Sequence, residues 1–173
     1  MDDSLHQALA LLIAPGLVVE VRTLTDQWIH SGYFDDREEL ARQVAALDTD
    51  QSVQGIYVTL NEVNPALLSR RANRIETRLS LKEATTADAD ISRRQWFPID
   101  IDPTRPSGIG ASDEEHEAAL EVARNVAGFL SEFCGFPAAL VADSGNGAHL
   151  LYRIDLPNDD ATTALIKRCL AAL

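Results

Sequence analysis

The feature that most constrains this fold is a short polar turn between two apolar segments. The string SGNG at 144–147 separates the apolar runs 138–142 and 148–154. Asn-Gly between two such runs is a strong short-range signal for a β-hairpin, because both central residues of a tight hairpin turn take positive φ. The sequence therefore predicts that these two segments pair as antiparallel strands.

The rest of the chain mixes strand-like and helix-like patterns. Alternating or β-branched apolar runs predict strands at 17–24, 28–34, 55–60 and 96–101. Apolar residues at helical spacing predict helices at 5–13, 37–47, 64–74, 113–133 and 161–173. The expected helix caps are Asp36, Asn158 and a capping box formed by Ser112 and Glu115. Residues 80–95 are polar without periodicity, which predicts a loop. We therefore expect an α+β fold, with a mixed or antiparallel sheet and flanking helices.

Length and charge limit the classes of partner. The chain has 173 residues with 15 Lys+Arg against 27 Asp+Glu, a net charge of −12. This length suits a single domain, 1–173, with a sizeable core. The acidic excess argues against a broad basic surface for nucleic acid, although a local one stays open. The absence of a membrane-length apolar run, the acidic start of the chain and the use of only two cysteines predict a cytoplasmic protein without a membrane partner.

Asp100 and Asp102 form the first candidate site. Residues two apart in a strand point to the same face, so the strand at 96–101 would present two carboxylates side by side. Such a pair repels and is costly to desolvate. Mg²⁺ or Mn²⁺, held by a few carboxylates together with water and phosphates, would relieve that cost. Alternatively, both acids face solvent at the end of the strand, where Pro103 turns the chain away.

The hairpin turn is the second candidate site. Its glycines would let backbone N–H groups approach an anion, and Ser144 and Asn146 would add hydrogen-bond donors. His149, just inside the next strand, could donate to a phosphate oxygen. The alternative is an ordinary hairpin that carries a partly buried histidine.

A third, weaker pattern is a group of arginines. Arg70, Arg74 and Arg78 would share one face if the helix at 64–74 continued further, and that face could contact the phosphates of a template strand. Alternatively, it is a solvated helix face. Three histidines have no partner at a suggestive spacing and receive no predicted role: His6, His30 and His116.

Two strings together resemble the archaeo-eukaryotic primase superfamily, in particular the primase-polymerase domains of phage, plasmid and mobile-element replication proteins. They are WFPIDIDPTRPSGIGASDEEHEAAL at 96–120 and PAALVADSGNGAHLLYRIDLPND at 137–159. The first is similar to the family's hydrophobic strand with an acid-x-acid motif, and the second to its motif of small residues followed by a histidine. The resemblance extends over about residues 28–160.

The resemblance implies a catalytic core like that of an RNA-recognition motif and two sets of site residues. The catalytic metals, Mg²⁺ or Mn²⁺, would be held by Asp100 and Asp102. The catalytic His149 would contact the triphosphate of the incoming nucleotide. The other nucleotide-binding residues would be Ser144, Asn146 and Arg105. The candidate nucleic-acid-binding residues Arg70, Arg74 and Arg78 come from the arginine pattern and not from the resemblance.

The implied activity is that of a DNA primase or polymerase: metal-dependent, template-directed transfer of a nucleotide from an NTP or dNTP on single-stranded DNA, with a helicase as a further partner. In this family another acid on a later strand completes the metal site. The nearest later acids, Asp143 and Asp155, lack that apolar-strand context. We therefore expect a domain that is incomplete at its C-terminal side: a fragment, an inactive form, or a half that a partner completes. We also expect it to self-associate.

Two other functions remain open at the level of the sequence. One is a non-catalytic module that binds nucleotides or nucleic acid with a primase-like fold. The other is a metal-dependent phosphohydrolase or nuclease that uses the same acidic pair.

Overall fold

The computed structural model describes residues 3–80, 82–83, 85–104, 106 and 109–173. The chain divides into two compact units, Met1–Arg94 and Gln95–Leu173. Each unit combines one antiparallel sheet with flanking helices, so the predicted α+β class with flanking helices is confirmed. In the described part of the chain, no helix is long and apolar enough to cross a membrane.

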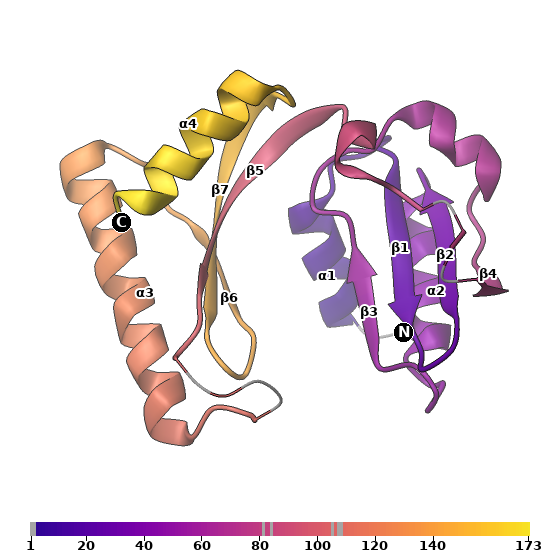
Figure 1. Ribbon diagram of the computed structural model, residues 1–173, viewed down its shortest axis with the longest axis horizontal. Helices are drawn as coiled ribbons and strands as arrows, with labels where there is room; N and C mark the ends of the chain where they lie inside the picture. Colours follow the sequence, from indigo (N-terminus) through magenta and orange to yellow (C-terminus); the bar gives the residue numbers. More distant parts are fainter. Residues whose placement is uncertain (1–2, 81, 84, 105, 107–108) are drawn as a thin grey trace. The chain divides into compact units, whose positions relative to one another are not determined.

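The first unit is built on a four-stranded sheet in the order β3-β1-β2-β4, with every neighbouring pair antiparallel (Figure 1). The strands are β1 (Val19–Leu24), β2 (Ile29–Phe34), β3 (Gly55–Val58) and β4 (Glu76–Leu79). β1 and β2 form a hairpin, and β3 pairs with the free side of β1. The first three strands lie within the segments that the sequence predicts as strands, whereas β4 was not predicted.

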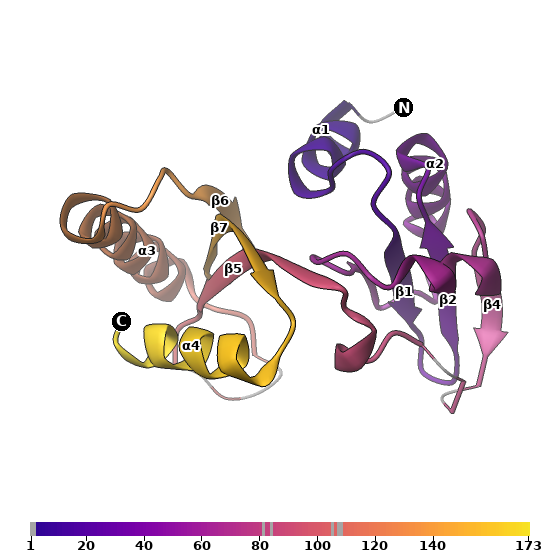
Figure 2. The same ribbon diagram turned by 90° about the horizontal axis from the view of Figure 1, so that it is seen from above.

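Two helices cover one face of this sheet (Figure 2). They are α1 (Asp3–Leu12) and α2 (Arg37–Leu47). The carboxylate of Asp36 accepts hydrogen bonds from the first backbone N–H groups of α2, which confirms the predicted cap. Leu9 and Leu40 of the helices pack with Val21 and Phe34 of the sheet. Side chains alternate along a strand, so Glu20, between the core residues Val19 and Val21, points to the sheet face away from the helices.

Two predictions for the end of this unit are wrong. The helix expected at 64–74 is a 3₁₀ helix, η1 (Pro65–Arg70). It stops there because Arg71, which is 4% exposed, turns inward and donates to the carboxylates of Glu76 and Glu83. The loop expected at 80–95 contains a short 3₁₀ helix, η2 (Asp88–Asp90), and the start of β5.

The second unit has a three-stranded sheet in the order β5-β7-β6. Its strands are β5 (Arg93–Ile101), β6 (Leu140–Asp143) and β7 (Ala148–Pro157). The predicted hairpin is confirmed, because β6 and β7 pair antiparallel up to Asp143 opposite Ala148. The turn is tight, since the Ser144 N–H donates to the Gly147 carbonyl oxygen at 3.1 Å, but the expected positive φ at both Asn146 and Gly147 is wrong. Of the four loop residues 144–147, only Gly145 has positive φ, at 77°.

Helices α3 (Asp113–Cys134) and α4 (Asp160–Ala171) pack on one face of this sheet. The capping box at the start of α3 is confirmed, but the cap of α4 is Asp159 rather than Asn158. The core on this face includes Phe97, Ile99, Leu150 and Tyr152 of the sheet, packed with Ala123, Leu130 and Ile166 of the helices. The opposite face carries the alternate residues of β5 and β7.

Candidate active site

The structure brings Asp100 and His149 together on the sheet face opposite α3 and α4. Ile99 and Ile101 belong to the core beneath the helices, so Asp100 between them points the other way. The same alternation along β7, with Ala148 and Leu150 in the core, directs His149 to this face. His149 Nε2 lies 3.1 Å from Asp100 Oδ1, and both side chains are partly exposed. Residues 49 positions apart in the sequence thus form one ion-pairing site.

Asp102 is positioned by the hairpin turn. It follows the last residue of β5 and is exposed. A Cβ added at Gly147 would lie 2.1 Å from the carbonyl oxygen of Ile101 and 2.8 Å from Asp102 Oδ1. Only glycine permits so close an approach of two backbone segments. Gly147 therefore lets the turn pack directly against the end of β5 and against Asp102.

Ser144 and Asn146 hold the turn in place. The Ser144 hydroxyl accepts from the Gly147 N–H at 3.0 Å and lies 3.2 Å from the Gly147 carbonyl oxygen, to which it can donate. Asn146 Oδ1 accepts from the backbone N–H of Ala111 at 2.9 Å. These bonds give both side chains a structural role that the sequence did not indicate, and their contact with a nucleotide stays a prediction.

A contact between His116 and Asp143 was missed by the sequence analysis. His116 Nε2, in the first turn of α3, lies 2.8 Å from Asp143 Oδ1. The same oxygen accepts from the Gly145 N–H at 2.7 Å. The Gly145 N–H and then His116 hold the pKa of Asp143 below its ordinary value. The two partners are 27 residues apart, so no local spacing could have indicated the pair.

Neither later acid is placed to join Asp100. Asp143 is directly opposite Ala148, a core residue, so it lies on the face that bears the helices. Asp155 lies six residues beyond His149 on β7, about 20 Å along an extended strand. Across the described residues, no group of three or more His, Cys, Asp or Glu side chains is arranged to hold a metal ion.

The donors that are present fit one kind of metal. Asp100 and Asp102 offer carboxylate oxygens, the hard ligands that Mg²⁺ and Mn²⁺ accept. Two carboxylates suit an ion that takes its remaining ligands from water and from substrate phosphates. They do not suit an ion enclosed entirely by protein ligands.

The predicted arginine surface is not formed as expected. The helix η1 ends at Arg70 and does not continue through Arg74 and Arg78. The three arginines therefore do not share one helix face. Arg78 lies in β4 with φ at 59°, a backbone conformation that residues other than glycine rarely adopt. All three arginines are exposed, and their contact with nucleic acid stays a prediction. Arg105 lies outside the described residues.

Comparison of the chain with models of protein families, with curated proteins and with solved structures found no significant match.

Proposed function

We propose that this chain is a nucleotidyltransferase of the primase-polymerase type, which transfers a nucleotide from an NTP or dNTP to a 3′-hydroxyl on a single-stranded DNA template. The observation that supports this proposal most is the Asp100–His149 pair, 3.1 Å apart on neighbouring strands. Its carboxylate suits a metal-bound triphosphate, and its imidazole suits the phosphate oxygens beside that metal.

Each residue has a distinct role in the proposed reaction. Asp100 and Asp102 would bind Mg²⁺ or Mn²⁺, which, when bound, neutralises charge on the triphosphate. A protonated His149 has two N–H donors, one for Asp100 and one for a phosphate oxygen. The 3′-hydroxyl loses its proton to water as its oxygen bonds to the α-phosphorus, while the bond from that phosphorus to the α–β bridging oxygen breaks and pyrophosphate leaves. His149 would stabilise negative charge on the departing phosphates.

A non-catalytic nucleotide-binding module is the second candidate. It is favoured by the positions of Asp143, on the opposite face, and Asp155, far along β7. With two carboxylates the chain could hold a metal–nucleotide complex while lacking ligands for two ions, which in-line phosphoryl transfer commonly uses. A metal-dependent phosphohydrolase or nuclease would use the same acidic pair.

An extension assay, read together with nucleotide binding and phosphate release, separates the three functions. The chain is incubated with a primed single-stranded DNA template, labelled dNTPs or NTPs, and Mg²⁺ or Mn²⁺, and the products are resolved by length. Extended products that disappear in Asp100→Asn support the proposal. Nucleotide binding without extension supports the binding module, and shortened DNA or free phosphate supports the hydrolytic alternative. Extension of equal yield in wild type and Asp100→Asn contradicts the assigned site.

A further inference from the structure

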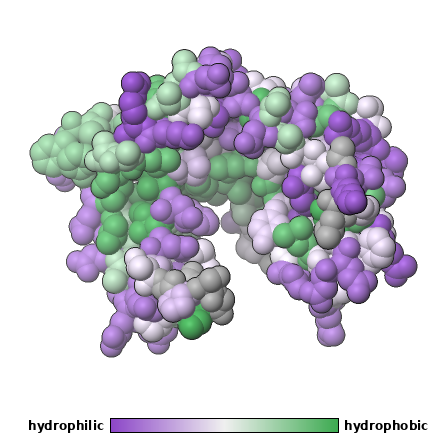
Figure 3. All heavy atoms as spheres, viewed as in Figure 1, coloured by the Kyte–Doolittle hydropathy of each residue, from purple (hydrophilic) through white to green (hydrophobic). Residues whose placement is uncertain are grey.

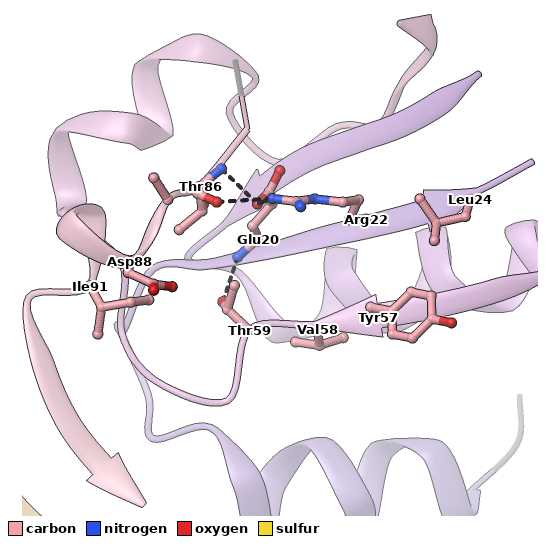
Figure 4. Close-up of a pocket in the computed structure, with 10 residues that line it drawn as sticks. Glu20, Arg22, Leu24, Tyr57, Val58, Thr59, Thr86, Asp88 and Ile91 are labelled. Carbon is pink, nitrogen blue, oxygen red and sulfur yellow. Dashed lines mark hydrogen bonds and ion pairs between the residues drawn. The ribbon is translucent and has the colours of Figure 1, made fainter. Parts of the chain in front are cut away.

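A pocket that does not include the proposed active-site residues lies entirely within the first unit (Figure 4). It has a volume of about 400 Å³, within the range of small-molecule sites. Strands β1 and β3 form its floor on the face away from α1 and α2, and the segment 86–91 forms its wall. The residues that determine its chemistry are Glu20, Arg22, Tyr57, Thr86, Asp88 and Ile91.

A buried ion pair fixes the floor of this pocket. Glu20 is 1% exposed, and its carboxylate accepts from the Ser31 hydroxyl at 2.6 Å, from Arg22 Nη2 at 2.8 Å and from the Thr86 N–H at 3.1 Å. Arg22 Nη2 also donates to the Thr86 carbonyl oxygen at 3.1 Å. Within the described chain, Nε and Nη1 of Arg22 donate to no other group. The guanidinium is thus held in one orientation with unused donors.

An exposed aromatic ring lies on the same sheet face as the fixed guanidinium. Tyr57 is directly opposite Arg22 in the pairing of β1 with β3, so the two side chains share one face of the sheet. Tyr57 is 57% exposed and the neighbouring Leu24 is 38% exposed. Tyrosine rings and guanidinium planes both stack on flat aromatic ligands. The pocket therefore offers two groups that can stack on a flat ligand, with aliphatic side chains around them.

We propose that this pocket binds a planar nitrogenous base, as a free nucleoside or as one base of a single-stranded nucleic acid. Arg22 would donate to an acceptor on the edge of the base, and the Asp88 carboxylate would accept from a ring or exocyclic N–H. The carboxylates of Glu20 and Asp88 would repel a phosphate, so the pocket favours the uncharged base. This site lies on different residues from Asp100 and His149 and goes beyond the proposed transfer reaction.

The probe is 2-aminopurine riboside, whose fluorescence is quenched when it stacks on an aromatic ring. We expect saturable quenching by the full chain that changes little between low and moderate salt, because no phosphate takes part. Tyr57→Ala should weaken binding about tenfold or more, the effect of losing one stacked ring. Tyr57→Phe keeps the ring and should bind within about twofold of wild type. A single-stranded oligonucleotide with one 2-aminopurine then distinguishes a base in a strand from a free nucleoside.

The controls separate this inference from the proposed reaction. Asp100→Asn and His149→Ala should leave riboside binding unchanged, whereas they should abolish or weaken nucleotide transfer. Absence of saturable quenching by either probe, or equal affinity in wild type and Tyr57→Ala, overturns the base-binding pocket without affecting the transfer reaction. Loss of riboside binding in Asp100→Asn would also overturn it, because the base would then lie in the second unit.

Discussion

At the scale of single residues, Gly147 decides whether the turn and the acidic strand can pack together. In Gly147→Ala the added Cβ would meet the backbone oxygen of Ile101, which cannot rotate away. We expect a loss of about 1–3 kcal/mol in the free energy of unfolding, as for other overpacked sites, together with weaker Mn²⁺ binding because Asp102 is displaced. Thermal denaturation and calorimetric titration measure the two effects.

Gly145→Ala is the matched control in the same turn. Its φ of 77° makes alanine unfavourable, but its added Cβ would meet no atom within 4 Å. This variant should lose about 1 kcal/mol of stability from the backbone alone and keep the Mn²⁺ affinity of wild type. If both variants bind Mn²⁺ equally well, Gly147 does not position the metal-binding acid.

Glu20 makes the stability of the first unit depend on pH. Burial raises its pKa, but the hydrogen bonds from Ser31, Arg22 and Thr86 outweigh burial, so the net pKa lies below that of an ordinary glutamate. A carboxyl group with a lowered pKa stabilises the fold above its unfolded pKa, and this contribution disappears as the pH falls through the folded value. Denaturant titrations between about pH 7 and pH 3 should show the free energy of unfolding fall. The fall should begin in the ordinary range of carboxyl pKa values and continue below it.

Glu20→Gln tests the assignment. Glutamine keeps the size of the side chain but cannot provide a charged acceptor for Arg22. We expect lower stability at pH 7, by about 1–3 kcal/mol, and a shallower fall in stability in acid. An acid transition that is as steep in the variant as in wild type would assign the pH dependence to other carboxylates.

At the scale of elements, His116 ties the β6–β7 turn to α3. His116→Ala removes the partner of Asp143, while the bond from the Gly145 N–H remains. We expect faster hydrogen exchange at the Gly145 amide and a pKa of Asp143 closer to its ordinary value, both measurable by NMR. His6→Ala, which removes a histidine beside Glu38 in the first unit, is the control and should change neither. Unchanged exchange in His116→Ala would mean that the Gly145 bond alone holds the turn.

The elements that the sequence predicts well are those specified by local patterns. The β6–β7 hairpin follows from two apolar runs around a polar turn, and α3 from its capping box and helical spacing. β4 lacks a local signal, because its four residues have only Leu79 buried and it is identified by pairing with β2.

The candidate site is likewise predicted from the sequence only where a local pattern specifies it. The spacing of Asp100 and Asp102 in the sequence indicates a shared face, but the proximity of Asp100 to His149 depends on how β5 and β7 pair. The His116–Asp143 contact and the packing of Gly147 on Ile101 join distant segments, so they emerge only from the folded chain.

At the scale of the whole molecule, an exposed aromatic pair on α3 bears on the expected self-association. Phe129 and Phe133 are 49% and 75% exposed, and their rings stack with centroids 5.5 Å apart. Figure 3 shows apolar residues gathered over the C-terminal end of α3. Exposed aromatic surface of this kind commonly marks a contact site. We expect concentration-dependent association in sedimentation experiments, and Phe129→Ser with Phe133→Ser should weaken it without unfolding the chain. A wild-type chain that stays monomeric at high concentration contradicts this expectation.

The small number of carboxylates at the site limits how tightly it holds metal without a nucleotide. Asp100 and Asp102 supply few ligands, so Mn²⁺ alone should bind weakly. A triphosphate adds oxygen ligands of its own, and dATP should therefore raise the apparent Mn²⁺ affinity by about tenfold or more. Asp100→Asn with Asp102→Asn should abolish this gain in calorimetric titrations. Equal Mn²⁺ binding by wild type and the double variant would mean that the acids only face solvent.

His149 distinguishes nucleotide binding from folding in the same experiment. Its side chain is 45% exposed, so His149→Ala should leave the Tm nearly unchanged while it weakens dATP binding by about 1–3 kcal/mol, the range for a hydrogen bond to a charged group. With Asp143 on the opposite face and Asp155 far along β7, we also expect extension of a primed template to be slow but measurable, and to be lost in Asp100→Asn. Efficient synthesis would instead require a third metal ligand beside Asp100. A large fall in Tm with unchanged dATP affinity would make His149 a structural residue and remove the main support for the proposed reaction.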